Sequence, residues 1–486
     1  MKTISRDFRN RNEADTTAFD IGIIGGGASG IILLLHLIKQ ATGSLSLLLF
    51  NSGYPLSKGV AYSTTDQDHL LNVRAGRMSL YADEPLHFVE WLKKQQEYPA
   101  ALGQDNDQDA FVPRYLYGRY LSETFQNVLD RLPDHIQVHI AEVKVIEISK
   151  NEIFTIKTET GELFHVHHAA LCTGIESPVQ LPGIKELPAD ERIHINPWIN
   201  KNLSVKSEEH VLLIGTGLTM VDHVLSLINS DFKGSITALS KHGQLHLAHP
   251  EHKQSLKSDI PFIPPADLKG LFSLIKKRIK EHPDPQGWEE PVLEDIRPYT
   301  QQLWFNYSTE EKQQFLRHLQ HLWSKLRHRI PYNIYLQLKS AIDHHQLKLA
   351  GGFLTGIEIQ PQQLLVTFKN RKKNSNETIV VNRIINCTGP VLDVDRSTNP
   401  LIRSLSQQGL IRNSASKLGP DAMPDGRLID KAGKTHEDFF TLGPPLRGVI
   451  WEAVAVPEIR VGSKEIARII ISRISSKDLL QRTGDH

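Results

Sequence analysis

Residues 21–38, IGIIGGGASGIILLLHLI, combine an apolar strand pattern, a glycine series and an apolar helix pattern. The series has the spacing Gly25-x-Gly27-x-x-Gly30, and its position between strand and helix is the context that a dinucleotide-binding turn requires. Gly25 permits a tight turn, Gly27 lets backbone approach a pyrophosphate, and Gly30 lets the helix pack on the strand. The stretch therefore predicts a Rossmann-like βαβ unit.

Ala28 and Ser29 open the predicted helix, where free N–H groups would bind the phosphates. The next strand, SLSLLLF, ends before Asn51, where this motif usually has a carboxylate for the ribose hydroxyls. Asn51 can still accept a hydrogen bond through its amide oxygen, so we expect it beside the ribose.

Residues 211–228, VLLIGTGLTMVDHVLSLI, repeat the pattern and predict a second nucleotide-binding unit. Gly215 and Gly217 keep the first two glycine positions, and Met220 replaces the third, so the helix is expected to pack less closely on its strand. Lys241 and His242 follow the next strand. A cation there favours the 2′-phosphate of NADPH, and NADH is the alternative.

Two apolar strands end in the similar sequences ALCTG, residues 170–174, and INCTG, residues 385–389. Such strand ends mark where the chain crosses between two nucleotide domains, and they make Thr173, Gly174 and Gly389 candidate cofactor contacts. Both cysteines of the chain lie in these motifs and form no C-x-x-C pair. We expect buried packing residues, not a disulfide reductase.

The chain has 486 residues and a net charge of +1, so we expect two or three domains and no nucleic-acid partner. The first residues lack the apolar core of a signal peptide, and no apolar run is long enough to span a bilayer. These features predict a cytoplasmic protein. His246, His249 and His252 lack the accompanying carboxylates of a metal site, so none is expected.

Apolar positions at helical spacing predict a helical insertion over residues of about 265–345. The expected fold class is α/β, with two Rossmann-like dinucleotide-binding domains and this insertion. A final helix is expected over residues 456–474. The expected division is a flexible tail at 1–18, a split FAD domain at 19–205 and 351–486, and an inserted NAD(P) domain at 206–350.

Longer blocks of sequence resemble a bacterial FAD/NAD(P)-binding family of flavoproteins with two dinucleotide domains. This family is related to the flavin-containing and N-hydroxylating monooxygenases. Besides the glycine turns and strand ends, the resemblance rests on KGVAYSTTDQDHLLNVRAGRMSLYADEPLHFVEWL (58–92), FVPRYLYGRYL (111–121), LWFNYSTEEKQQFLRHLQHLWSKLRHRIP (303–331) and LGPPLRGVIWEAVAVPEIR (442–460).

The resemblance implies bound FAD and NADPH (or NADH) and places several residues beside the flavin or its ribityl chain. They are Gly59, Tyr62, Leu71, Asn72, Arg77, Met78 and Arg114. For Arg77 and Arg114, surface or interdomain salt bridges are the alternative.

Two catalytic candidates remain, Trp451 and His194. Gly443 ends a strand ahead of the last helix, and Trp451 follows it, either stacked near the isoalloxazine or buried in the core. His194 and Trp198 match half of a signature found in flavin-containing and Baeyer–Villiger monooxygenases, or lie on an interdomain linker.

The resemblance implies a monooxygenase that uses dioxygen to hydroxylate a small molecule through a flavin C4a-peroxide. One alternative is a flavin-dependent reductase or dehydrogenase with another electron acceptor. A second alternative, motivated by Asn51 and Met220, is a non-catalytic nucleotide-binding module. The sequence leaves the substrate and the oligomeric state open.

Overall fold

The computed structural model describes residues 4–5, 18–96, 107–176, 180–181, 183–184, 188–198, 205–250, 263–281 and 289–484. Most of the expected N-terminal tail, like His252, lies outside these residues. Within the tail, Ile4–Ser5 forms the short strand β1, which pairs in parallel with Val138 and His139 of β4.

The first unit is built on a nine-stranded sheet with the order β1-β4-β3-β2-β7-β16-β15, to which β5 and β6 add a meander beside β7. Its central strands are parallel and almost wholly buried, as expected for a sheet covered on both faces. The further strands are β2 (Phe19–Ile24), β3 (Leu45–Phe50), β4 (Ile136–Ala141), β5 (Val145–Lys150), β6 (Phe154–Thr158), β7 (Leu163–Leu171), β15 (Arg427–Ile429) and β16 (Thr435–Thr441).

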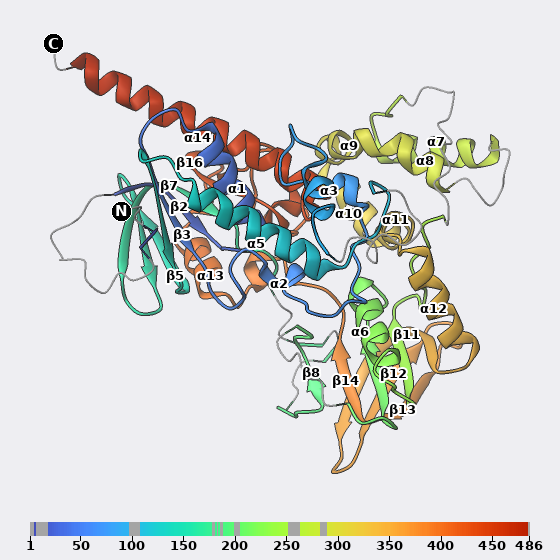
Figure 1. The fold of residues 1–486 in the computed structure, drawn as a ribbon. Coiled ribbons are helices and arrows are strands. Elements are labelled where there is room, and N and C mark those ends of the chain that lie inside the picture. The colour runs from blue at the N-terminus through green and yellow to red at the C-terminus, as the bar shows by residue number, and fades with distance from the viewer. Residues whose placement is uncertain are drawn as a thin grey trace.

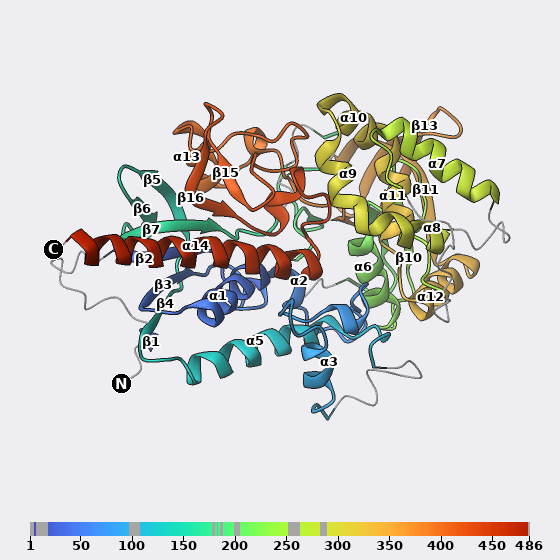
Figure 2. The ribbon, with the colours of Figure 1, turned by 90° about the horizontal axis from the view of Figure 1, so that it is seen from above.

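Helices α1, α5 and α14 cover one face of this sheet, and α13 lies on the other (Figure 2). The helical elements of this unit are α1 (Ala28–Gln40), α2 (Gly59–Tyr62), η1 (Ala75–Arg77), α3 (His87–Leu92), α5 (Arg114–Asp130), η4 (Val394–Arg396), α13 (Pro400–Gln407), η5 (Pro444–Gly448) and α14 (Val456–Gly484).

The second unit lies below the first in Figure 1 and is built on a seven-stranded sheet, β13-β12-β11-β10-β9-β14-β8. Strands β8 to β11 and β14 run parallel, and β11 to β13 form an antiparallel meander. The elements are β8 (Ile193–His194), β9 (His210–Ile214), α6 (Leu218–Ile228), β10 (Ser235–Ser240), α12 (Tyr332–Asp343), β11 (Leu347–Ile359), β12 (Leu364–Asn370), β13 (Asn376–Val381) and β14 (Arg383–Asn386).

The sheets divide the chain differently from the boundary expected at residue 351. Strand β11 crosses that position, with Gly351 paired to Ser240 of β10, and β12 to β14 stay in the second sheet up to Asn386. Strand β8, expected in the first unit, pairs with β14. Alternating strand patterns show that a segment is a strand, but long-range hydrogen bonds decide which sheet it joins.

The expected helical insertion is present, and in Figure 1 it lies above the second unit and next to the first. Its core contains Trp304 and Phe315, and Trp451 from the C-terminal segment packs among them. The elements are α7 (Leu268–Glu281), α8 (Glu289–Ile296), η2 (Arg297–Tyr299), α9 (Thr300–Asn306), α10 (Thr309–Gln314), the π-helical turn η3 (Phe315–Leu319) and α11 (Gln320–Arg327).

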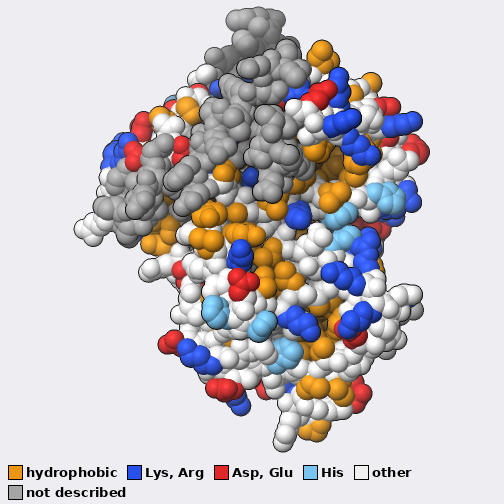
Figure 3. Space-filling view, turned by 90° about the vertical axis from the view of Figure 1, so that its right-hand side faces the viewer, with side chains coloured by type: hydrophobic (Ala, Val, Ile, Leu, Met, Phe, Trp, Pro, Cys, Tyr) orange, Lys and Arg blue, Asp and Glu red, His pale blue; other side chains and the backbone are white. Residues whose placement is uncertain are grey.

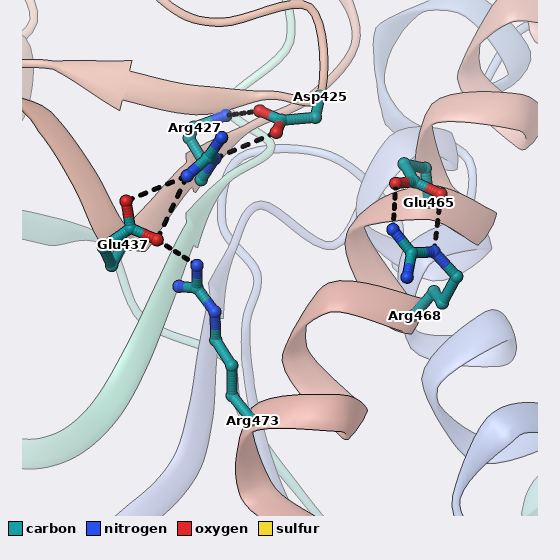
Figure 4. Close-up of polar contacts among 6 residues, drawn as sticks. All are labelled: Asp425, Arg427, Glu437, Glu465, Arg468 and Arg473. Carbon is teal, nitrogen blue, oxygen red and sulfur yellow. Dashed lines mark hydrogen bonds and ion pairs between the residues drawn. The ribbon is translucent and has the colours of Figure 1, made fainter. Parts of the chain in front are cut away.

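Helix α14 begins at Val456 as expected and continues past the expected end to Gly484. Figure 4 shows how it meets the sheet: Arg473 pairs with Glu437 of β16, whose carboxylate also accepts from Arg427 of β15 at 2.9 Å. No helix in the described parts of the chain is long and apolar enough to cross a membrane.

Candidate functional site

The first glycine turn lies at the carboxyl end of β2. Gly25 has a φ of +118°, and a Cβ atom there would lie 2.2 Å from the carbonyl oxygen of Cys172 at the end of β7. A Cβ on Gly30 would lie 1.9 Å from the carbonyl oxygen of Gly25. Only glycine can bring turn, helix and neighbouring strand this close together.

Helix α1 begins directly after this turn, and its N-terminus carries no side-chain cap and no acidic residue. Its first N–H groups are therefore available to an anion. A Cβ on Gly27 would lie 3.4 Å from Gly59 Cα, and a Cβ on Gly443 would lie 2.4 Å from Ser29 Oγ. The start of α2 and the C-terminal turn thus border the N-terminus of α1.

Asn51 follows β3 beside the same turn. Its Nδ2 donates to the carbonyl oxygen of Tyr54 at 3.1 Å, while its Oδ1 would lie 2.7 Å from a Cβ on Gly26. The amide oxygen therefore lies at the glycine turn, where a ribose acceptor is needed.

The second glycine turn repeats the first in detail. Gly215 has a φ of +116°, and a Cβ there would lie 2.4 Å from the carbonyl oxygen of Cys387. Gly217 caps α6 without a side-chain cap and has open space around its Cα. Met220 of α6 is fully buried and belongs to the hydrophobic core of the second unit.

The glycines of the strand-end motifs lie close to these turns. Gly174 and Gly389 both have positive φ, at +71° and +90°, and both have open space where a Cβ would be. Thr173 precedes Gly174 at the end of β7, beside the Gly25 contact. The backbone at both strand ends is therefore free of steric barriers to a ligand.

Two histidines and the cations Lys241 and Arg371 gather at the carboxyl end of β10. His242 stacks on His321 with ring centroids 3.9 Å apart, and Arg371 Nη1 lies 2.5 Å from His242 Nδ1. Lys241 is exposed next to them. Burial and these neighbouring cations lower the pKa of His242 to about 4. Arg371 joins through the β11–β12 pairing, a long-range contact that the sequence pattern did not reveal.

The residues that the resemblance placed beside the flavin differ in how deeply they are buried and in what they contact. Leu71 and Met78 belong to the hydrophobic core of the first unit, at 4% and 2% exposure. Tyr62 packs on Tyr117 at 4.6 Å, and burial raises its pKa to about 12. The Asn72 carbonyl oxygen accepts from His249 at 3.4 Å.

Arg77 and Arg114 both form ion pairs. Arg77 lies 3.6 Å from Glu294 of the helical insertion, with both side chains about half exposed. Arg114 forms a buried ion pair with Asp222 of α6, across the boundary between the two units. The salt-bridge alternative therefore describes both arginines in this structure.

The two catalytic candidates, Trp451 and His194, both contact other side chains of the protein. Trp451 is 4% exposed and packs against Trp304 at 4.5 Å, so the core alternative holds for it. His194 is not on a linker but in β8, where its Nε2 lies 3.1 Å from Arg383 Nη1. Burial, followed by Arg383, lowers the pKa of His194.

Two of the histidines considered as metal ligands, His246 and His249, form hydrogen bonds with backbone carbonyl oxygens. His246 donates to the carbonyl oxygen of His328 at 2.8 Å, and His249 contacts Asn72. Among the described residues, no group of three or more potential metal ligands occurs. Burial raises the pKa of the Cys172 thiol to about 12 and that of Cys387 still further, so neither is a reactive thiolate.

Polar groups at the start of α14 were not recognised as a functional set from the sequence. Burial, followed by the charge of Glu452, raises the pKa of Glu458 to about 7. Glu458 Oε2, Glu452 Oε1 and Arg460 Nε are buried without a hydrogen-bond partner within the described structure. Buried polar atoms of this kind suit a site whose ligand supplies the missing partners.

This environment predicts a pH-dependent contribution of Glu458 to stability. Because the folded pKa exceeds the usual 4.5, stability is lost as pH rises from 4.5 through about 7. Glu458→Gln should therefore raise the free energy of unfolding above pH 7 by about 1–3 kcal/mol, with little gain below pH 4.5. Urea unfolding at several pH values measures this.

Glu465→Gln is the matched control on the same helix. Glu465 pairs with Arg468 on the surface (Figure 4), which lowers its pKa. Glu465→Gln should therefore lower the free energy of unfolding slightly, opposite to the effect of Glu458→Gln. Equal pH profiles for wild type and Glu458→Gln would contradict the assignment.

Comparison with known proteins agrees with this geometry. Residues 22–176 match the model of a family described as FAD-NAD(P)-binding. No curated protein matches the sequence.

Solved structures match over nearly the whole length. An ornithine N-hydroxylase from Kutzneria sp. 744, solved with reduced FAD, NADP+ and L-ornithine, has a TM-score of 0.64 at 14% identity, over 94% of this chain and 100% of that chain. Ornithine hydroxylase from Pseudomonas aeruginosa gives 0.65 and 14% over the same shares. L-lysine 6-monooxygenase from Pseudomonas syringae gives 0.61 and 16%, over 93% and 99%. Residues 22–176 therefore match the FAD-NAD(P)-binding family model, and the whole chain has the two-dinucleotide-domain fold of these solved structures.

Proposed function

We propose that the protein is an FAD-dependent oxidoreductase that takes its electrons from NAD(P)H and hydroxylates a small molecule with dioxygen. The observation that carries the proposal is the pair of equivalent glycine turns. Gly25 meets the Cys172 carbonyl, and Gly215 meets the Cys387 carbonyl, each below an uncapped helix N-terminus. One protein with two such turns is suited to bind two dinucleotides.

The first unit fits FAD and the second fits NAD(P)H. Around the first turn, the N-terminus of α1 would hold the pyrophosphate and Asn51 Oδ1 would accept from the ribose. The turn at Gly443 would close over Ser29 and keep water from the phosphates. Bound FAD would accept hydride from NAD(P)H and activate dioxygen.

The monooxygenase reading is favoured over the reductase by the relatives and by the cysteines. The structures quoted above belong to hydroxylases and monooxygenases. Cys172 and Cys387 are buried and lie at the ends of different sheets, so a thiol–disulfide relay has no partner pair here. The two free thiols also support a cytoplasmic setting.

The test begins with the absorption spectrum of the purified protein, which should be that of a flavoprotein. Anaerobic NADPH should bleach it. A monooxygenase should then couple NADPH oxidation to product once its substrate is found, whereas a reductase should reduce dyes faster than it reacts with oxygen. A colourless protein that refuses added FAD would leave only the non-catalytic alternative.

We expect NADPH to be preferred through the cations at the end of β10. Lys241→Ala and Arg371→Ala should each raise KM for NADPH by roughly 10-fold or more, since each removes a charged contact to the 2′-phosphate. KM for NADH, which lacks this phosphate, should stay unchanged. Lys369→Ala on the same meander serves as the control. Equal effects on both cofactors would contradict 2′-phosphate recognition.

A further inference from the structure

A cavity lies between the two units, and its lining includes none of the turn glycines. It has a volume of about 420 Å³ and is walled by residues after α2, by α6 and by the connecting segment around Trp198. Its α6 wall runs from His223 to Leu227, and Ser230 lies just beyond the helix. His223 lies about 8 Å along the axis from the first residue, Leu218, at 1.5 Å per residue.

Hydrogen bonds across the unit boundary fix a carboxylate in the wall. Ser226 Oγ of α6 donates to Asp66 Oδ2 at 2.5 Å, and the backbone N–H of Asp68 donates to Asp66 Oδ1 at 2.9 Å. His69 Nε2 lies 2.9 Å from Ser226 Oγ, and its Nδ1 lies 2.8 Å from Thr64 Oγ1. His69 Nε2 also lies 3.4 Å from Asp66 Oδ2, and the Asp66 side chain is still 30% exposed, so this held carboxylate remains accessible from the cavity.

The remaining lining is uncharged or aromatic. Trp198 lies 5.7 Å from the His223 ring, and His223 is 8% exposed with no partner for its Nε2. Burial lowers the pKa of His223 to about 4, so this imidazole is neutral at pH 7. Among the described residues that line the cavity, none is lysine or arginine. The hydroxyl groups come from Ser63, Thr64, Thr65, Ser207, Ser226 and Ser230.

The charges of the lining residues determine whether the cavity favours a cationic or an anionic ligand. A fixed carboxylate without a lining lysine or arginine disfavours anions and stabilises a cation. An indole face attracts both a planar ring and a cationic group. The volume is within the range of cavities that hold small organic molecules.

We propose that this cavity is a binding site for a small aryl-alkyl ammonium compound, with the ammonium group at Asp66, the ring at Trp198 and a hydrogen bond at His223. Residues of both units line the cavity. A bound cation therefore bridges the units and stabilises their present arrangement, beyond the oxidoreductase function proposed above.

Isothermal titration of the full chain with three similar probes tests the proposal. FAD and NADP+ are added in excess so that the nucleotide sites are filled, and the titration is repeated without them. 2-Phenylethylammonium should bind with a Kd on the order of 1 mM or tighter. Neutral 2-phenylethanol should bind roughly 10-fold more weakly, because it lacks the charge pair, and 3-phenylpropionate should not bind.

Variants locate the probe. Ser230→Phe puts a ring into the cavity from an exposed position and should abolish binding, whereas Ser340→Phe, exposed on α12, should not. Asp66→Asn should weaken binding roughly 10-fold. No binding of 2-phenylethylammonium, binding unchanged by Ser230→Phe, or equal affinity for the alcohol would overturn the proposal. These results do not depend on FAD retention, so the proposed function can fail separately.

Discussion

Gly30→Ala should abolish FAD retention and strongly destabilise the first unit. The added Cβ would lie 1.9 Å from the carbonyl oxygen of Gly25, a backbone atom that cannot move without breaking the turn. We expect FAD affinity to fall at least roughly 100-fold and the free energy of unfolding to fall by about 3 kcal/mol or more. Absorbance after gel filtration gives the bound flavin, and urea unfolding gives the stability.

Two matched variants separate steric damage from lost phosphate contacts. Gly43→Ala adds a methyl group where no atom lies within 4 Å and should leave both quantities unchanged. Gly27→Ala meets only Gly59, at 3.4 Å and beyond, so the fold should tolerate it. The new methyl should nevertheless obstruct the close approach of a pyrophosphate and weaken FAD binding. Stoichiometric flavin in Gly30→Ala would refute the assignment of this turn.

Breaking the ion pair between Arg114 and Asp222 should produce the second large effect. Their side chains are only 16% and 7% exposed, so Arg114→Met leaves an uncompensated buried carboxylate. Such a loss costs about 3–5 kcal/mol. Because the pair joins α5 to α6, flavin reduction by NADPH should slow as the two units lose their relative position. Urea unfolding and anaerobic stopped-flow absorbance measure the two effects.

The double variant Arg114→Met with Asp222→Asn tests whether the pair is the cause. It should recover much of the lost stability, since neither charge then remains buried alone. Arg77→Met is the control, because its pair with Glu294 is about half exposed and should contribute less than about 1 kcal/mol. If Arg114→Met loses FAD and the double variant does not regain it, Arg114 contacts the cofactor, as the resemblance implied.

The electrostatics of the surface agree with a small-molecule enzyme. Figure 3 shows Lys, Arg, Asp, Glu and His side chains mixed with exposed hydrophobic ones on the face of the insertion and the second unit. The net charge of +1 likewise provides no extended field of one sign. The two charge-recognition sites that we propose, at the end of β10 and at Asp66, are therefore local features of the surface.

The sequence alone determined the two nucleotide-binding turns. Gly25 and Gly215 could be assigned because a positive φ is a local property that favours glycine. Gly30 could be assigned because its closest contact is with Gly25 in the same turn. Helical periodicity likewise predicted the insertion and the start of α14, because the apolar residues on the buried face of a helix recur at helical spacing in the sequence.

Only the tertiary structure decided how distant segments share a surface. Arg114 pairs with Asp222, Trp451 packs on Trp304, and β12 to β14 extend the second sheet, all through contacts between residues far apart in the chain. A single arginine or tryptophan in a sequence is compatible with a cofactor, a core or an ion pair. The outcome depends on which partner desolvates and satisfies it, and that partner is set by the packing of whole elements.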